Sequence, residues 1–308
     1  LEFFRCLIDL RAGLNAARLE VPEDLQYAID RMAPALRFFR HAGGGLALFN
    51  GGREGSAQDC ETALAHAGLR GRPMPSLPHS GYERLAQGRG CLIMDVGLPP
   101  ASGHNDRAHA GIFSFEYSFG RERIIVNCGT SSVAGKWRRV LRSTLAHSTL
   151  SVENCNACRL EDDGLTATKT EVRAQKHEDA STAMIEGSHG GYLKKFGLVH
   201  HRIVQMKGEG DSLRGTDRLM GKAGARFGIR FHLHPDMEAE KCAEGVRLIS
   251  PGGGGWIFTV DEDINCALEE SVYAGTGDGA RPCLQIVLSG ETAGETTTVC
   301  WELRRERI

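Results

Sequence analysis

The chain lacks several features that would assign it at once to a class of protein. It has no run of about 18 apolar residues, which excludes an ordinary transmembrane helix. Its 10 cysteines among 308 residues are too sparse for a small secreted scaffold built from disulfides. The formal net charge is only -2, so the composition shows no bias towards nucleic acid or membrane surfaces, and neither is expected as a partner. A globular chain remains, long enough for one large or two ordinary domains.

The N-terminal segment also lacks the uninterrupted apolar stretch of a secretory signal peptide. Charged residues at positions 2, 5, 9 and 11 break it, and the sequence begins without methionine, as an internal point of a longer polypeptide would. We expect no signal peptide within this chain. Its compartment stays open between a bacterial periplasm and a bacterial cytoplasm.

Two short metal and redox motifs are absent or incomplete. Cys155-Asn156-Ala157-Cys158 is a single C-x-x-C motif, with no second copy to complete a zinc ribbon and no thioredoxin-like pattern around it. We therefore predict that the cysteines are reduced. No H-E-x-x-H motif is present, which disfavours a zinc hydrolase.

What is present divides the chain by its periodicity. Helical spacing of apolar residues is confined to residues 1–41, in LEFFRCLIDLRAGL and in PEDLQYAIDRMAPALRFF, which ends at a glycine run. Beyond Gly43 at least ten short β-rich runs alternate with turn residues, and GLALFNG is the first of them. The sequence therefore predicts a mainly β fold, with two helices followed by a large antiparallel β-sandwich that begins near residue 45.

One predicted hairpin brings chemically interesting residues together. The segment GIFSFEYSFG places aromatic residues 113, 115, 117 and 119 on one face, and Gly120-Arg121 turns the chain into ERIIVN. His109 and Asn127 should then lie at the same end of adjacent strands, while His147 begins another predicted strand. Two imidazoles beside an amide oxygen form a plausible metal site, and hydrogen-bonded structural histidines are the alternative.

Other residues permit two interpretations each. His232 and His234 share one face of a predicted strand and would suit either metal ligation or a core strand. His200 and His201 should point to opposite faces and so not act together. The predicted loop GKWRRVLRST carries Trp137 with Arg138 and Arg139, where an aromatic platform and cations would suit an acidic sugar, although an ordinary solvated loop fits equally.

These segments resemble the C-terminal β-domain of the heparinase II/III-like family of polysaccharide lyases. The resemblance extends over essentially the whole chain and rests on HAGIFSFEYSFGRERIIVNCGT, LRSTLAHSTLSVEN, RFHLHP, QIVLSG and VCWELRRE. It implies that residues 1–44 are the last helices of an α/α toroid and that residues 45–308 form the β-sandwich domain. It also implies a structural zinc ion held by His109, Asn127 and His147, with Asn127 where the family commonly has aspartate.

The same resemblance implies a β-elimination on a uronic-acid-containing polysaccharide of the glycosaminoglycan or alginate type. Where the family has a catalytic histidine, two positions before the zinc histidine, this chain has Arg107, and His104 lies three residues further back. We expect Arg107 to neutralise a substrate carboxylate and His104 to exchange a proton. Trp137 and Arg138 would bind the sugar.

The remaining catalytic groups of the family, among them a tyrosine, belong to earlier toroid helices that no segment of this chain matches. The chain alone should therefore be nearly inactive. An acidic polysaccharide is the expected partner, and a homodimer is a possible assembly. The competing hypothesis is a non-catalytic carbohydrate-binding or structural β-sandwich module.

Overall fold

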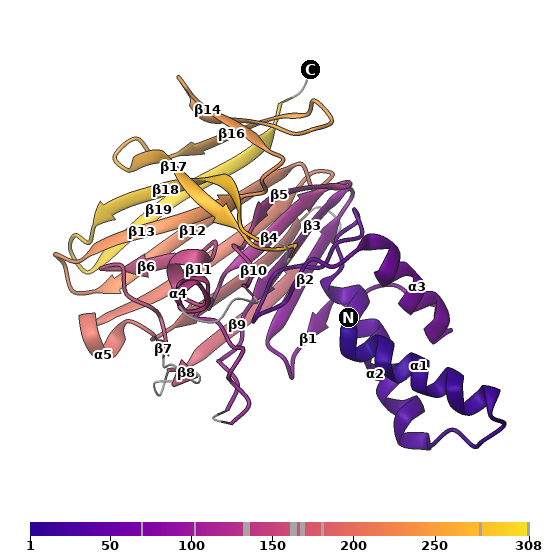
Figure 1. The fold of residues 1–308 in the computed structure, drawn as a ribbon. Helices are drawn as coiled ribbons and strands as arrows, with labels where there is room; N and C mark the ends of the chain where they lie inside the picture. Colours follow the sequence, from indigo (N-terminus) through magenta and orange to yellow (C-terminus); the bar gives the residue numbers. More distant parts are fainter. Residues whose placement is uncertain are drawn as a thin grey trace.

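The computed structural model consists of two large antiparallel sheets packed face to face, with helices at one end (Figure 1). It describes residues 1–68, 70–101, 103–131, 136–160, 165–166, 170–179, 182–276 and 279–306. Within these ranges no helix combines the length and the apolar character that crossing a membrane requires. The mainly β sandwich predicted from the sequence is confirmed.

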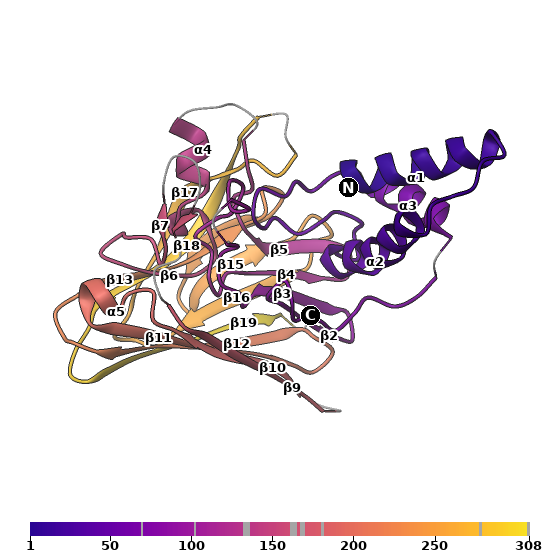
Figure 2. The ribbon, with the colours of Figure 1, turned by 90° about the horizontal axis from the view of Figure 1, so that it is seen from below.

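The helical end contains three helices: α1 (Glu2–Ala16), α2 (Glu23–Phe39) and α3 (Ala57–Ala67). Their apolar faces meet in one small core, in which Phe4 and Ile29 are almost fully buried. Both helices predicted from the sequence are present, and the three project from one end of the sandwich (Figure 2).

The third helix corrects the prediction that strands begin near residue 45. GLALFNG forms only an isolated bridge between Arg40 and Leu46, and the first strand starts at Ser76. The sequence of α3 is rich in alanine and has few large apolar residues, so it offers no long apolar stripe of the kind that identified α1 and α2. A better signal was its N-cap, where Ser56 Oγ accepts a hydrogen bond from the backbone N–H of Asp59 at 3.2 Å.

The first sheet has nine strands within the described residues. Its order is β1-β2-β3-β4-β5-β13-β18-β17, and β6 pairs with β13 beside this path. The strands are β1 (Ser76–Leu77), β2 (Tyr82–Gln87), β3 (Gly90–Asp95), β4 (Phe115–Phe119), β5 (Glu122–Val126), β6 (Leu150–Val152), β13 (Arg226–Leu233), β17 (Asn265–Tyr273) and β18 (Arg281–Glu291).

The second sheet has eight strands in the described part of the chain, in the order β14-β15-β16-β19-β12-β11-β10-β9. These are β9 (Val172–Glu178), β10 (Thr182–His189), β11 (Leu198–Lys207), β12 (Ser212–Gly221), β14 (Glu238–Cys242), β15 (Gly245–Ile249), β16 (Gly255–Val260) and β19 (Thr296–Arg305). The remaining elements are short: α4 (Lys136–Leu141), the 3-10 helix η1 (Thr144–Ala146), the pair β7 (Arg159–Leu160) and β8 (Leu165–Thr166), and α5 (Leu193–Phe196).

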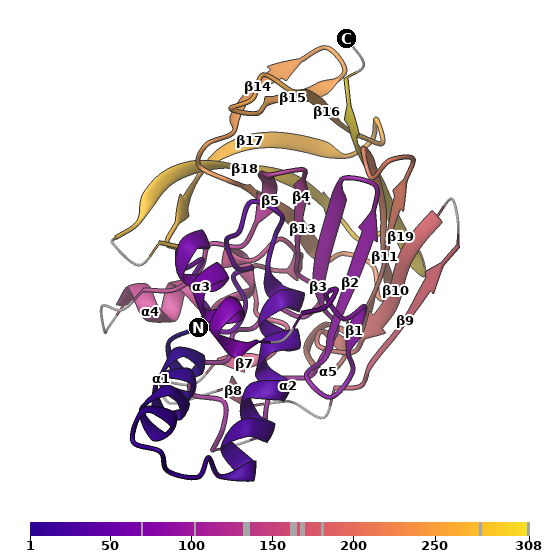
Figure 3. The ribbon, with the colours of Figure 1, turned by 90° about the vertical axis from the view of Figure 1, so that its right-hand side faces the viewer.

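An aromatic core lies between the two sheets. Trp301 of β19 stacks on Phe115 of β4 with ring centroids 5.9 Å apart and meets Phe231 of β13 edge to face at 4.7 Å. Because such pairs add to the burial of large apolar area, they fix how the two sheets lie on each other. Figure 3 shows the two sheets from the helical end, with α1 to α3 in front of the sandwich.

The β4–β5 hairpin sorts its side chains as the alternation predicted, but β4 is shorter than expected. Phe115 and Tyr117 enter the main core, whereas Glu116 points to the other face of the sheet, where it contacts His41 just after α2. The strand begins at Phe115, because Phe113 adopts a positive φ of 58° and turns the chain just before it. His109 and His147 therefore lie in loops before β4 and β6, not at the first residues of these strands.

Candidate functional site

Two buried histidines from different loops form the centre of the candidate site. Nδ1 of His109 lies 3.1 Å from Nε2 of His147, and the two rings meet almost at right angles, at 87°. Nδ1 of His147 lies 2.7 Å from the backbone carbonyl of Ser143. Because a carbonyl only accepts, Nδ1 of His147 carries the proton, so Nε2 accepts a hydrogen bond from Nδ1–H of His109.

The loop before His109 is held by side chains from elsewhere in the chain. The backbone N–H of His109 donates to Oδ1 of Asn50 at 2.7 Å. Arg142, itself buried, donates from Nε to the carbonyl of Ala108 at 2.9 Å and from Nη2 to the carbonyl of Asn105 at 3.4 Å. These bonds fix the backbone that leads into His109.

Both imidazoles of this pair are neutral near pH 7. Burial, followed by the nearby His147 and Arg142, lowers the pKa of His109 well below its usual value. Burial lowers the pKa of His147 to about 4, although the Ser143 carbonyl and Glu116 act in the opposite direction. Neutral imidazoles are the form that ligates metals and the form that accepts hydrogen bonds.

Asn127 is joined to the residue that follows His147. Its Oδ1 accepts the backbone N–H of Ser148 at 3.0 Å, and no group in the described part of the chain is hydrogen-bonded to its buried Nδ2. The 3.1 Å between the two histidine nitrogens is close to the spacing of two ligands on a tetrahedral zinc ion, roughly 3.3 Å for bonds near 2.05 Å. A third, acidic ligand is missing, however, since residue 127 is asparagine. The N–H₂ group of Asn127 is a hydrogen-bond donor and would repel a cation.

Zinc at His109, Asn127 and His147 thus stays a prediction, and the residues fit it only in part. No cluster of three or more histidine, cysteine or acidic side chains suited to a metal occurs in the described ranges. As the side chains lie, they form a hydrogen-bonded pair.

A buried charge network lies next to the pair and was not foreseen from the sequence. Oε1 of Glu116 accepts the backbone N–H groups of Leu48 and Asn127, both at 3.0 Å. Oε2 lies 2.7 Å from Nη2 of Arg123 and 3.2 Å from Nε2 of His41. Burial alone would raise the pKa of Glu116, but Arg123 and His41 outweigh it and lower the pKa to about 2.

The network extends to another strand of the same sheet. Nη1 of Arg123 donates to the hydroxyl of Tyr273 at 2.9 Å, and that hydroxyl donates to Glu54 at 2.6 Å. The available sequence signal was Glu116 within an otherwise apolar and aromatic strand, since a buried carboxylate needs a cation. Its partners come from distant segments, so the sequence did not name them.

His104 and Arg107 lie on the same loop as His109 and are both exposed. The exposed side chain of Arg138 reaches this loop, where its Nη2 donates to the carbonyl of Asp106 at 3.1 Å. Arg138 thus fastens the segment between His104 and Arg107, while both of those side chains face solvent. The structure places these three residues together on one surface.

Trp137 and Arg138 belong to a helix, which corrects the predicted loop. The segment KWRRVL forms α4, which was too short to show periodicity in the sequence. Trp137 is half exposed and lines a hollow of about 630 Å³ together with Arg139. Trp137 and one arginine of the same segment therefore line one hollow, and that arginine is Arg139 and not Arg138.

The floor of this hollow carries a cysteine, a histidine and a serine. Nδ1 of His232 lies 2.8 Å from Oγ of Ser271 and 3.4 Å from Sγ of Cys128, while Nε2 lies 3.0 Å from the carbonyl of Leu145. Burial lowers the pKa of His232 to about 3 and raises the pKa of Cys128 to about 12. Both groups are neutral near pH 7, so the arrangement lacks a thiolate and a strong base.

The remaining histidine and cysteine predictions can be stated briefly. His200 is buried and His201 is partly exposed, so their opposite orientation is confirmed. His232 is buried and hydrogen-bonded as above, and His234 contacts Asp236 at 3.5 Å. All ten cysteines are free, as predicted.

Comparison with known proteins gives one family and one curated relative. The family described as Heparinase II/III-like, C-terminal, matches residues 69–302. FtsZ-localized protein C of Caulobacter vibrioides is 32% identical in an alignment that covers 97% of this chain and 55% of that protein.

Solved structures share the fold. The heparan sulfate lyase HepC of Pedobacter heparinus superposes with a TM-score of 0.75 at 16% identity, covering 99% of this chain and 51% of the lyase. A heparinase III structure gives a TM-score of 0.74 at 14% identity, over 98% of this chain and 52% of the other. The chain thus spans about half the length of the proteins that it matches.

Proposed function

From the premise that this chain belongs to the heparinase II/III-like family, through its C-terminal domain, we propose that the whole protein is a polysaccharide lyase. Its substrate in this proposal is a uronic-acid-containing polysaccharide of the glycosaminoglycan or alginate type. The observation that carries the proposal is the loop of residues 104–109. Arg138 and Arg142 fix its backbone, and it presents His104 and Arg107 at the surface beside a buried histidine pair.

The chemistry defines what each group does. In β-elimination a base removes the proton next to the uronate carboxylate, a carbon–carbon double bond forms, and the bond to the glycosidic oxygen breaks. The leaving oxygen then takes a proton. Arg107 matches the planar carboxylate bidentately and stabilises the charge that develops there. His104 exchanges a proton with the sugar or the leaving oxygen.

This chain supplies only part of the site in the proposal. General acid and base groups are effective only when several of them converge on one sugar. The other groups come from the part of the protein outside this chain. Trp137 and Arg139, which share the hollow beside α4, bind a neighbouring sugar unit.

The test is the formation of an unsaturated uronate product by the whole protein, followed by ultraviolet absorbance across a panel of uronic acid polymers. Arg107→Ala and His104→Ala should each lower the rate about 10²-fold or more without changing the melting temperature. The control is Arg72→Ala, because Arg72 is exposed and lies outside the loop of residues 104–109. If both loop variants retain full activity, these two assignments are wrong.

A second candidate is a non-catalytic module used for recognition or assembly. Its support is the 32% identity to a protein named for its localization with FtsZ, and not for action on a saccharide. If the whole protein forms no unsaturated product from any uronate polymer but co-sediments with FtsZ filaments, this candidate replaces the lyase. The homodimer stays a prediction for size-exclusion chromatography.

A further inference from the structure

A tight turn at residues 49–52, where GLALFNG ends, lies against the loop of residues 104–109. Its two central residues, Asn50 and Gly51, both have positive φ, of 46° and 75°. A backbone hydrogen bond of 2.8 Å joins its first and last residues. Asparagine followed by glycine is the pair that such a turn favours, because both residues tolerate positive φ.

The side chain of Asn50 joins this loop to β2. Its Oδ1 accepts the backbone N–H of His109 at 2.7 Å, and its Nδ2 donates to the hydroxyl of Tyr82 at 2.5 Å. Because the N–H of His109 needs the amide oxygen, the donor of the amide is left for Tyr82. Tyr82 is itself buried, and its ring meets the rings of Phe39 and Phe49 edge to face, at 4.8 and 5.3 Å.

Gly51 lies against the backbone of the same loop. A Cβ atom at Gly51 would come within 3.3 Å of the carbonyl oxygen of Arg107 and within 4.0 Å of Nε2 of His109. A side chain at Gly51 would therefore press on Arg107 and narrow the approach to that ring nitrogen. The turn thus holds the loop through a side chain at one residue and through close backbone contact at the next.

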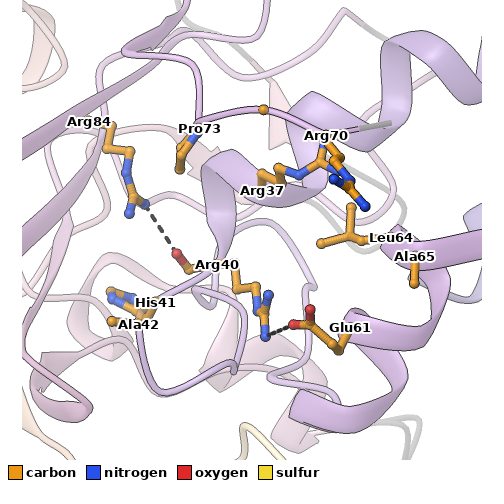
Figure 4. A pocket seen from close by; sticks show the side chains of 11 residues that line it. Arg37, Arg40, His41, Ala42, Glu61, Leu64, Ala65, Arg70, Pro73 and Arg84 are labelled. Carbon is orange, nitrogen blue, oxygen red and sulfur yellow. Dashed lines mark hydrogen bonds and ion pairs between the residues drawn. The ribbon is translucent and has the colours of Figure 1, made fainter. Parts of the chain in front are cut away.

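β2 is in turn fastened to the helical end of the chain. Nη1 of Arg84, two residues after Tyr82, donates to the carbonyls of Phe38 and Arg40 at the end of α2, at 2.7 and 3.3 Å. Figure 4 shows Arg84 and Arg40 in contact beside a hollow of about 580 Å³ that α2, α3 and β2 line. A continuous set of contacts therefore leads from α2 through β2 and Asn50 to the loop.

We propose that Asn50 is a positioning residue of the lyase site, and that Gly51 makes room for the loop to lie where Asn50 holds it. This inference rests on the proposed function, in which Arg107 and His104 act on the substrate. Asn50 itself contacts no reacting group. It sets the position of Arg107 and His104 relative to the helical end, while the other catalytic groups come from outside this chain.

The test is steady-state kinetics of the whole protein on the uronate polymer that it cleaves fastest. Asn50→Ala removes both hydrogen bonds and should lower kcat about tenfold or more, because small displacements of catalytic groups are costly. It should also raise KM, since Arg107 binds the substrate carboxylate. A mere loss of folded protein would lower the apparent kcat and leave KM unchanged.

Two conservative variants divide the two hydrogen bonds. Asn50→Asp keeps an acceptor for the N–H of His109 and should restore most of kcat and KM. Tyr82→Phe removes only the bond to β2, so its kinetics should lie between those of Asn50→Asp and Asn50→Ala. Melting temperatures are measured in parallel, and all assays are run well below the lowest of them.

Gly51→Ala has a matched control in Gly68→Ala. Both glycines have a φ of 75°, so alanine meets the same backbone strain at either residue. A Cβ at Gly68, just after α3, meets no atom within 4 Å, whereas one at Gly51 meets Arg107. Gly51→Ala should therefore lower kcat and raise KM, and Gly68→Ala should change neither.

The outcomes separate this inference from the proposed function. If the unmodified protein is active and Asn50→Ala keeps its kcat and KM, the positioning role is wrong and the lyase proposal stands. Equal losses in Asn50→Ala and Asn50→Asp would also contradict that role. Equal losses in Gly51→Ala and Gly68→Ala would reveal only backbone strain. If the unmodified protein forms no unsaturated product, the lyase proposal fails and takes the inference with it, before any variant is made.

Discussion

The protein contains two buried histidine pairs that are nearly identical in geometry and different in their surroundings. In the site, His109 and His147 approach to 3.1 Å with rings at 87°. In the second sheet, His189 and His200 approach to 3.0 Å with rings at 89°. Geometry alone therefore does not distinguish a candidate site from a structural pair, and the difference lies in where each chain of hydrogen bonds ends.

The pair in the sheet is closed at both ends. Nε2 of His200 donates to Oδ1 of Asp217 at 2.7 Å, and Nδ1 of His189 accepts the backbone N–H of Gly191 at 3.1 Å. Asp217 in turn binds the buried Arg202, whose Nη1 donates to the carbonyls of Phe113 and Ser148. All four ring nitrogens are thus engaged, and the network ties the second sheet to the loops that carry the site.

The site pair is closed at one end only. Nδ1 of His147 donates to Ser143, but within the described residues no group is hydrogen-bonded to Nε2 of His109. Burial lowers the pKa of all four histidines, and the carboxylate of Asp217 opposes this only at His200. The comparison indicates that only the site pair has a ring nitrogen to offer a ligand.

The largest expected effect comes from breaking the closed network. Asp217→Ala leaves the guanidinium of Arg202 buried without its carboxylate, and it also removes an acceptor from Trp301 Nε1 at 2.9 Å. We expect a loss of about 3–5 kcal/mol in the free energy of unfolding, measured by urea denaturation. The control on the same strand is Arg214→Ala, whose ion pair with Glu302 is half exposed and should be worth about 1 kcal/mol or less. Equal losses in the two variants would remove the special role of the buried network.

The sequence could predict one of these pairs far better than the other. His109 and His147 each precede a strongly alternating run, the hairpin turn at Gly120 indicated that His109 and Asn127 lie together, and the family resemblance added His147 to them. Asp217 and Arg202 face each other only through the register of β11 and β12, which periodicity does not specify. Similarly, the sandwich followed from alternation, whereas α3 and α4 were too poor in large apolar residues or too short to be recognised.

A buried histidine without a carboxylate partner should make the fold sensitive to acid. Burial lowers the pKa of His232 to about 3, against about 6.5 in the unfolded chain. Between these values the unfolded state binds a proton that the folded state does not. The free energy of unfolding should therefore fall as the pH falls from 6.5, by about 1.4 kcal/mol per pH unit for this residue.

The measurement is urea denaturation of the unmodified chain and of His232→Gln between pH 7.5 and pH 5. Glutamine does not titrate, so the variant should lose less stability over this range. If both proteins show the same slope, the neutral state assigned to His232 in the folded protein is wrong.

The metal hypothesis for the site pair can be tested by supplying the carboxylate that the pair lacks. In Asn127→Asp, an acidic oxygen replaces a buried amide nitrogen that has no partner among the described residues, so that one carboxylate joins the two imidazoles as candidate ligands. Zinc should then raise the free energy of unfolding by about 2.7 kcal/mol at a hundredfold excess over its dissociation constant. The unmodified chain should respond less, and Asn127→Ala is the matched control. A response of Asn127→Ala equal to that of Asn127→Asp would show that zinc binds elsewhere.

The smallest effect is expected from a neighbour of the closed pair. His201 lies on the other face of β11 from His200, and its Nε2 is 2.9 Å from Oε1 of Glu186 near the surface. Exposed ion pairs contribute little, so His201→Ala should change the free energy of unfolding by about 1 kcal/mol or less. His200→Ala deprives the buried Asp217 and His189 of a partner and should cost about 1–3 kcal/mol or more. Urea denaturation of the two variants compares adjacent histidines of one strand directly. A loss for His201→Ala as large as that for His200→Ala would mean that burial and hydrogen-bond closure do not decide which histidine supports the fold.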